Sequence, residues 1–172
     1  MDKFLVMIAL VAISFVQTIN AQENSSQPIQ PVIGAYLELK NALVQDNGIT
    51  ARAAAKKLYD AIDKVPMDKL TAAEHKVWMD NQVKLSYHAE HIKGTDDVEH
   101  QREHFVQLSD YFYKIVKGMN ENAADLYYQF CPMANDGKGA YWVSENEAIS
   151  NPYFGKRMMK CGSTKDTILT HQ

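Results

Sequence analysis

Two cysteines and two nearby methionines carry the most distinctive chemistry in this chain. Cys131 begins Cys-Pro-Met and Cys161 ends Met-Met-Lys-Cys, so each thiol has a thioether two or three positions away. Thiolates and thioethers are soft ligands, which select Cu(I) and related ions over Mg²⁺ or Ca²⁺. We therefore predict a Cu(I) or Ag(I) site with four ligands: Cys131, Met133, Met158 and Cys161.

The spacing of these residues predicts how they would converge. Side chains alternate along a strand, so Cys131 and Met133 would point to the same side if their segment is extended. Met158 and Cys161 are three positions apart and would share a face of a short helix. A Cys131–Cys161 disulfide is the alternative, because paired cysteines in exported proteins are usually bridged. Both interpretations stay open at this point.

Aromatic residues crowd the same region. They predict a small core that joins a hairpin to the rest of the fold; the alternative is a wall that shields a bound soft ion, and sulfur–aromatic contacts fit both. The residues are Tyr127, Tyr128, Phe130, Tyr141, Trp142, Tyr153 and Phe154.

Histidines form a second candidate set. His100 and His104 are four positions apart, and His88 and His91 are three apart, spacings that can bind zinc or copper. Neither pair belongs to a His-Glu-x-x-His motif or has an acidic cluster beside it, and the first pair lies off the apolar stripe of its segment. We therefore interpret these histidines as solvated faces.

One further histidine and the lack of catalytic motifs complete the survey. His75 precedes Trp78 by three positions, which predicts a core histidine that could reach the metal. No Gly-x-Ser-x-Gly and no phosphate-binding glycine loop occurs, so we expect no enzyme activity.

The N-terminal residues predict export. Lys3 precedes the apolar run Phe-Leu-Val-Met-Ile-Ala-Leu-Val-Ala-Ile-Ser-Phe-Val, and Ala21 is a small residue at the cleavage position, so residues 1–21 are typical of a signal peptide; an uncleaved anchor is the alternative. Residues 22–30 are polar and are expected to form a disordered leader. We thus expect a periplasmic protein, in an oxidising compartment.

Four segments with apolar residues at helical spacing follow the leader. We predict a mainly α fold: an antiparallel four-helix bundle with a small C-terminal β-hairpin and short helix. This single domain spans 31–165, with its Cys/Met region at 127–162 and a tail at 166–172. The expected helices run from Pro31 to the stop at 46–48, from Thr50 to Pro66, from Thr71 to about Lys93, and from after Asp96 to Gly118.

Composition excludes two classes of partner. The net charge is −3 and mean hydropathy is −0.35, with no basic patch, so we expect no nucleic-acid binding. No second long apolar run exists, so we expect no stable membrane insertion after signal cleavage.

The motifs around the cysteines are similar to those of a bacterial periplasmic domain family of uncharacterised function. Its members occur alone or appended to heavy-metal efflux adaptors, the membrane fusion proteins of copper/silver RND pumps. The matching residues are Cys-Pro-Met-Ala at 131–134, Gly-Ala-Tyr-Trp-Val-Ser at 139–144, Asn-Pro-Tyr-Phe-Gly at 151–155, Met158, Cys-Gly at 161–162, His75 with Trp78, and Gln101-Arg102 with Phe105, Leu108 and Ser109. Val143 stands where the family favours leucine.

This resemblance implies a helical bundle with a metal-associated hairpin and a role in handling copper, silver or a related ion. It implies a heavy-metal RND efflux adaptor or pump as partner; the alternative is a disulfide-stapled periplasmic interaction module without metal. The residues expected to support the site structurally are Trp142, Asn151, Pro152, Tyr153, Phe154 and Gly155.

Overall fold

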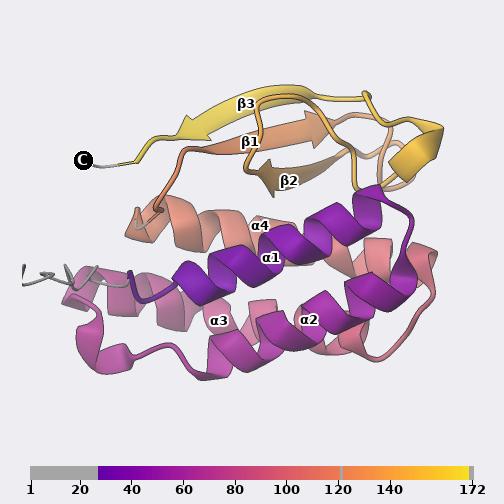
Figure 1. The fold of residues 1–172 in the computed structure, drawn as a ribbon. Coiled ribbons are helices and arrows are strands. Elements are labelled where there is room, and N and C mark those ends of the chain that lie inside the picture. Colours follow the sequence, from indigo (N-terminus) through magenta and orange to yellow (C-terminus); the bar gives the residue numbers. More distant parts are fainter. Residues whose placement is uncertain (1–26, 121, 171–172) are drawn as a thin grey trace, which may run out of the picture.

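The computed structural model describes residues 27–120 and 122–170, in which four antiparallel helices precede a small three-stranded sheet (Figure 1). This confirms the predicted fold class. None of the helices in the described residues is long and apolar enough to cross a membrane. The elements are α1 Gln30–Val44, α2 Gly48–Asp63, η1 Met67–Lys69, α3 Ala72–Lys93, α4 Val98–Met119, β1 Leu126–Cys131, β2 Ala140–Ser144, η2 Gly155–Arg157 and β3 Ser163–Ile168.

Side-chain caps define where the helices begin. Asn47 accepts a hydrogen bond from the Thr50 amide at 3.0 Å and starts α2 two residues earlier than expected. α3 begins as predicted at Thr71 with a capping box, because Thr71 and Glu74 each accept the other's backbone N–H. Asp97 caps α4 by accepting the backbone N–H groups of Glu99 and His100. These contacts satisfy amides that have no partner within the helix.

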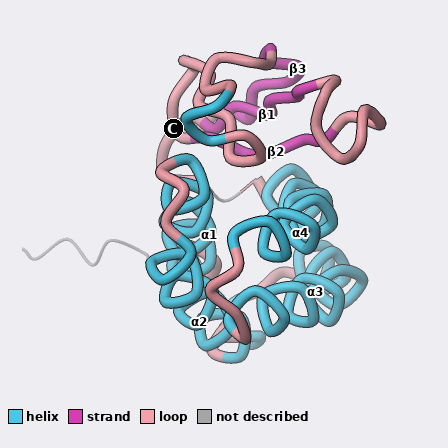
Figure 2. The backbone as a smooth tube through the Cα atoms, turned by 90° about the vertical axis from the view of Figure 1, so that its right-hand side faces the viewer, coloured by secondary structure: helices cyan, strands magenta, loops and turns pink. Residues whose placement is uncertain are grey.

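The helices and the sheet form three layers. Seen along the bundle, the sheet covers α1 and α4, while α2 and α3 lie on the far side (Figure 2). Each helix turns an apolar stripe inward. The largest buried side chains in the core include Tyr36, Leu58, Trp78, Phe105, Phe112 and Trp142.

The sheet has the order β2–β1–β3 and all its strands are antiparallel. The predicted hairpin is confirmed, with Cys131 opposite Ala140. The third strand is a correction: residues 166–168, expected in a tail, belong to β3, which pairs with β1. Polar residues such as Lys165 and Asp166 hide this strand from an apolar pattern, because it lies at an exposed edge.

Two further boundaries differ from the sequence predictions. The helix expected near Lys156–Gly162 is only the short η2, and Met158–Cys161 forms a turn. The expected leader is shorter, because Ile29 is buried in the core and Gln30 begins α1. The predicted signal peptide and residues 22–26 lie outside the described residues.

Tyr36 fastens the sheet to the bundle. Its ring stacks on Phe112 with centroids 3.7 Å apart, and its hydroxyl lies 2.8 Å from the Ser109 hydroxyl. The same oxygen accepts the Val143 backbone N–H at 3.0 Å. One buried side chain therefore links α1, α4 and β2, and no polar atom of the ring is left without a partner.

Arg102 joins three distant segments at the other end of α4. Its guanidinium donates to the carbonyls of Leu43 (3.0 Å) and Pro152 (2.8 Å) and to the Asp46 carboxylate (2.6 Å). The side chain is only 7% exposed, and its pairing with a carboxylate indicates a structural role for it. Gly155 must lack a side chain here, because φ is +54° and a Cβ would lie 1.9 Å from Asp46 Oδ1.

Replacing Asp46 with asparagine tests this junction. Asparagine tolerates the φ of 58° at this position, so the change removes mainly the charge. Although partial burial acts to raise it, hydrogen bonds from Arg102 and Lys156 hold the pKa of Asp46 below 3.8. We expect D46N to lose about 1–3 kcal/mol of unfolding free energy at neutral pH, measured by chemical denaturation.

The pH dependence supplies the control. A depressed folded pKa contributes stability that is present above the unfolded value and is lost as pH falls through the folded value. The difference between wild type and D46N should therefore shrink below pH 3.8. Equal stability of the two proteins at neutral pH would contradict the assigned role.

Candidate metal centres

The two cysteines meet at one end of the sheet. Cys131 is the last residue of β1 and is fully buried, whereas Cys161 follows η2 and is half-buried; both are free thiols. The Cys131 thiol lies close enough to Cys161 to raise the pKa of the Cys161 thiol. The structure thus brings together two predicted ligands that lie far apart along the chain.

Asn151 holds the segment that carries Cys161. Its amide nitrogen donates to the Cys161 carbonyl at 2.8 Å, and its backbone N–H donates to the Met159 carbonyl at 2.9 Å. Its side-chain oxygen accepts the N–H groups of Tyr153 (2.8 Å) and Phe154 (3.2 Å). A single buried side chain therefore folds the Asn-Pro-Tyr-Phe-Gly motif against the turn before the thiol.

The methionines do not have the predicted local geometry. β1 ends at Cys131, so Met133 stands in the following turn and is 54% exposed, whereas Cys131 is buried. The strand-alternation argument is wrong for this pair, because Pro132 already lies beyond the strand. Met158 and Cys161 are the ends of a tight turn closed by a 3.0 Å hydrogen bond, which keeps them close without a helix.

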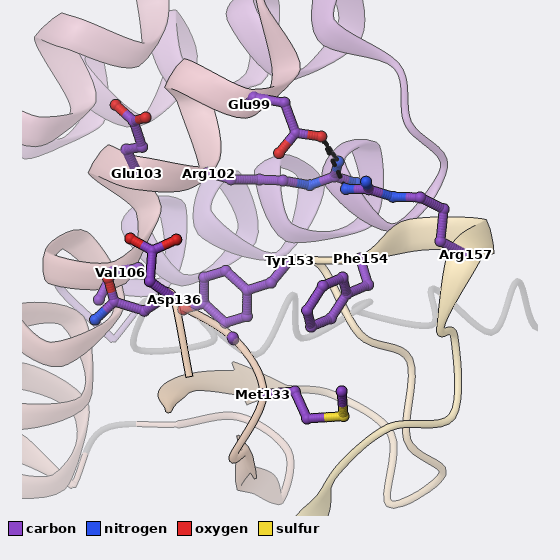
Figure 3. A pocket seen from close by; sticks show the side chains of 11 residues that line it. Glu99, Arg102, Glu103, Val106, Met133, Asp136, Tyr153, Phe154 and Arg157 are labelled. Carbon is purple, nitrogen blue, oxygen red and sulfur yellow. Dashed lines mark hydrogen bonds and ion pairs between the residues drawn. The ribbon is translucent and has the colours of Figure 1, made fainter. Parts of the chain in front are cut away.

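A cleft of about 260 Å³ opens beside Met133 (Figure 3). In this view the Met133 side chain lies beside Phe154, and Glu103 and Asp136 lie on the other side of Tyr153. Glu99 also lines the cleft and binds Arg157 at 2.9 Å. Arg102 also lines the cleft and pairs with Glu99 at 3.2 Å, so the wall beside the exposed thioether carries both carboxylates and guanidinium groups.

The aromatic cluster joins the sheet to α4. Tyr113 of α4 stacks on Tyr128 of β1, with centroids 3.6 Å apart, and Tyr128 stacks on Tyr141 of β2 at 4.7 Å. Phe130 lies 4.4 Å from Tyr141. This is the small stapling core expected from the sequence. Trp142 is buried and packs against Gly162, the residue after Cys161: a Cβ on Gly162 would lie 2.8 Å from the Trp142 ring.

The histidine pairs meet, which the sequence interpretation missed. His91 of α3 and His100 and His104 of α4 place one ligand atom each within 4.8 Å of one another, so that this cluster could hold a metal ion. His88 Nδ1 lies 3.2 Å from His104 Nδ1. The available signal was the short connection 94–97 between α3 and α4, which folds the end of one helix against the start of the next.

His75 does not behave as expected. Its side chain is exposed near the start of α3, a helix on the side of the bundle away from the sheet (Figure 2). The prediction of a core histidine is wrong because Trp78 turns inward from the next helical turn while His75 faces solvent.

Burial keeps part of the histidine cluster uncharged. Desolvation, followed by the neighbouring His104 and His91, lowers the pKa of His88 to about 4. Desolvation and the nearby His91 and His100 also lower the pKa of His104. Both imidazoles are therefore neutral at neutral pH and have nitrogen lone pairs, the form that binds metals.

Comparison with known proteins identifies the family. A family model described as "Protein of unknown function (DUF3347)" matches residues 32–124, more than half of the chain, so the chain belongs to this family. The match covers the four helices and the histidine cluster and ends before β1, so Cys131 and Cys161 lie outside it. No curated protein and no solved structure matches the chain.

The contact between the thiols predicts slow alkylation. The hydrogen bond with Cys131, and then burial, raises the pKa of Cys161 from 9.0 to about 11. Near pH 8 this shift reduces the thiolate fraction about 100-fold, while the more basic thiolate is roughly tenfold more nucleophilic. We expect reduced Cys161 to react with iodoacetamide about tenfold more slowly than an unperturbed thiol, followed by mass spectrometry.

A Cys131→Ala variant is the control for this measurement. Removing the hydrogen-bond partner should return the pKa of Cys161 toward 9.0 and accelerate its alkylation. Equal rates in wild type and variant, both fully reduced, would show that the two thiols do not interact.

Proposed function

We propose that this member of the DUF3347 family is an exported binding protein for a soft metal ion, Cu(I) or Ag(I), held at the sulfur cluster of Cys131, Cys161, Met133 and Met158. The observation that carries the proposal is the proximity of two free thiols, Cys131 at the end of β1 and Cys161 in the turn after η2. Soft thiolate and thioether ligands select Cu(I) and similar ions.

The surroundings of the thiols support a soft-metal role. Cys131 is fully buried and Met133 is exposed at the cleft, so the cluster has one inner, protected ligand and one outer ligand within reach of solvent. An ion could bind first at the exposed thioether and then reach the thiols by ligand exchange.

A role in heavy-metal efflux or resistance is the wider form of this proposal. In it, the protein resides in the periplasm and passes its ion to a heavy-metal RND efflux adaptor or pump. The N-terminal apolar run supports export, and the Cys/Met motifs support the association with efflux adaptors. Transfer would release one sulfur ligand as a ligand of the partner attaches.

The same thiol contact favours a second candidate function. In an oxidising compartment two adjacent thiols can form a disulfide, which would tie the turn after η2 to β1. The protein would then act as a disulfide-stapled interaction module without metal, with the exposed residues of the cleft as its contact surface.

Anaerobic Cu(I) titration of the reduced protein, followed by native mass spectrometry, separates these functions. We expect one Cu(I) per chain and competition with a chromogenic Cu(I) chelator, because two soft thiols are free to ligate. If the isolated protein has a mass two hydrogens below that of the reduced chain, and takes up no copper after reduction, the result would instead favour the disulfide module.

Methionine variants test the ligand set. M133L combined with M158L should weaken Cu(I) binding at least about tenfold, or 1.4 kcal/mol, because leucine keeps the volume and removes the sulfur donor. Met79→Leu is the matched control, since Met79 is also exposed (49%) but lies on α3. Unchanged Cu(I) affinity in the double variant would reduce the site to its two thiols.

A further inference from the structure

The histidine cluster between α3 and α4 differs in chemistry from the sulfur cluster. It offers three imidazole nitrogens, one each from His91, His100 and His104, all within 4.8 Å of one another. Imidazole suits borderline divalent ions such as Zn²⁺, whereas Cu(I) prefers sulfur. We infer that this cluster is a second metal site, which takes a borderline divalent transition-metal cation and is independent of the proposed sulfur site.

The backbone holds the three ligands on two rigid elements. His100 and His104 are one turn apart on α4, and His91 lies in the last turn of α3. The rings of His91 and His104 are stacked with centroids 4.4 Å apart, and those of His100 and His104 are 4.9 Å apart. Nitrogens bound to one tetrahedral Zn²⁺ lie about 3.3 Å apart, so side-chain rotation of the exposed rings can close the site.

His88 completes the arrangement from outside. Its Nδ1 lies 3.2 Å from His104 Nδ1, so a hydrogen bond between them fixes the orientation of the His104 ring. When His104 donates this bond, its Nε2 is left with a lone pair for a metal, as in sites where a second group sets the tautomer of a ligating histidine. His88 is itself held between Tyr87 and Tyr111 by ring contacts.

The exposure of the ligands defines the kind of site. His91 and His100 are exposed and His104 is partly buried, so a bound ion would keep a face open to solvent. The Glu103 carboxylate lies 3.6 Å from His100 Nδ1 and adds a negative charge beside the ligands. A site with three protein ligands and an open position holds an exchangeable ion, unlike a closed four-ligand structural site.

Two faces of α4 keep this site apart from the sulfur cluster. Glu99, Arg102 and Val106 line the cleft beside Met133, whereas His100 and His104 meet α3; Glu103 lies between, since it lines the cleft and also approaches His100. An ion at the histidines would cross-link α3 to α4 without contacting either cysteine. The two sites should therefore fill independently, and the inference stands or falls separately from the proposed function.

Zn²⁺ titration of metal-free protein without a polyhistidine tag tests the inference. The titration is made in a Cys161→Ser background, so that the thiol pair cannot supply the ligands. Isothermal calorimetry should give one Zn²⁺ per chain, and thermal stability should rise on binding because the ion binds the folded state alone. No Zn²⁺ binding in this background would overturn the inference.

Histidine variants locate the bound ion. His100→Gln removes an exposed ligand with little effect on packing and should lower Zn²⁺ affinity more than about tenfold, while His88→Gln should lower it about 10–100-fold by freeing the His104 ring. His75→Gln is the matched control, being an exposed histidine of α3 outside the cluster, and should bind like the background. Equal Zn²⁺ affinities in His100→Gln and His75→Gln would overturn the inference. Independence of the two sites is tested with His100→Gln in the protein that keeps both cysteines, where loss of Cu(I) binding would contradict it.

Discussion

The buried guanidinium of Arg102 is the interaction on which the rest of this structure depends. An isolated buried charge is costly, so it must be matched by acceptors from several directions. Here they come from the end of α1, the turn after it, and the Asn-Pro-Tyr-Phe-Gly motif. Arg102 binds the Pro152 carbonyl, and the neighbouring Asn151 holds the Cys161 turn. Arg102 on α4 therefore helps to position the second thiol.

The bundle and the sheet have different roles in this arrangement. The four helices supply the frame with which the family match coincides, and one hydrophobic core runs through both the helices and the sheet. The sheet contributes Cys131, and the turn before β3 contributes Cys161. The sheet rests on α1 and α4 through Tyr36 and the Tyr113–Tyr128–Tyr141 stack. Aromatic side chains suit this role, because one ring brings a large apolar area and its hydroxyl finds a polar partner.

Local sequence patterns made the helices predictable, whereas features that depend on long-range packing could not be predicted from the sequence. The apolar spacing, the Thr71–Glu74 capping box and the Asp136-Gly137 turn each express a preference that acts over a few residues. β3 is a polar edge strand with no such local preference, and its extended conformation depends on its pairing with β1. The Met158–Cys161 turn likewise depends on Asn151, ten residues before the thiol.

The candidate sites show the same limit. Residue types alone pointed to Cys131 and Cys161, and their contact in the fold agrees with that grouping. The histidines were judged one helix at a time, and each pair looked like a solvated face. Their convergence is a property of the α3–α4 pair, because an antiparallel connection of four residues places His88 and His91 opposite His100 and His104.

The hydrogen bond between Tyr36 and Val143 has a consequence for the order of folding. It joins residues 107 positions apart, whereas the cysteines are separated by 30. The entropic cost of closing the longer loop is greater by about 1 kcal/mol, and contacts between consecutive helices close shorter loops than either. Folding therefore favours early formation of the helical frame and late docking of the sheet, so the buried environment of Cys131 is among the last features of the native state to form.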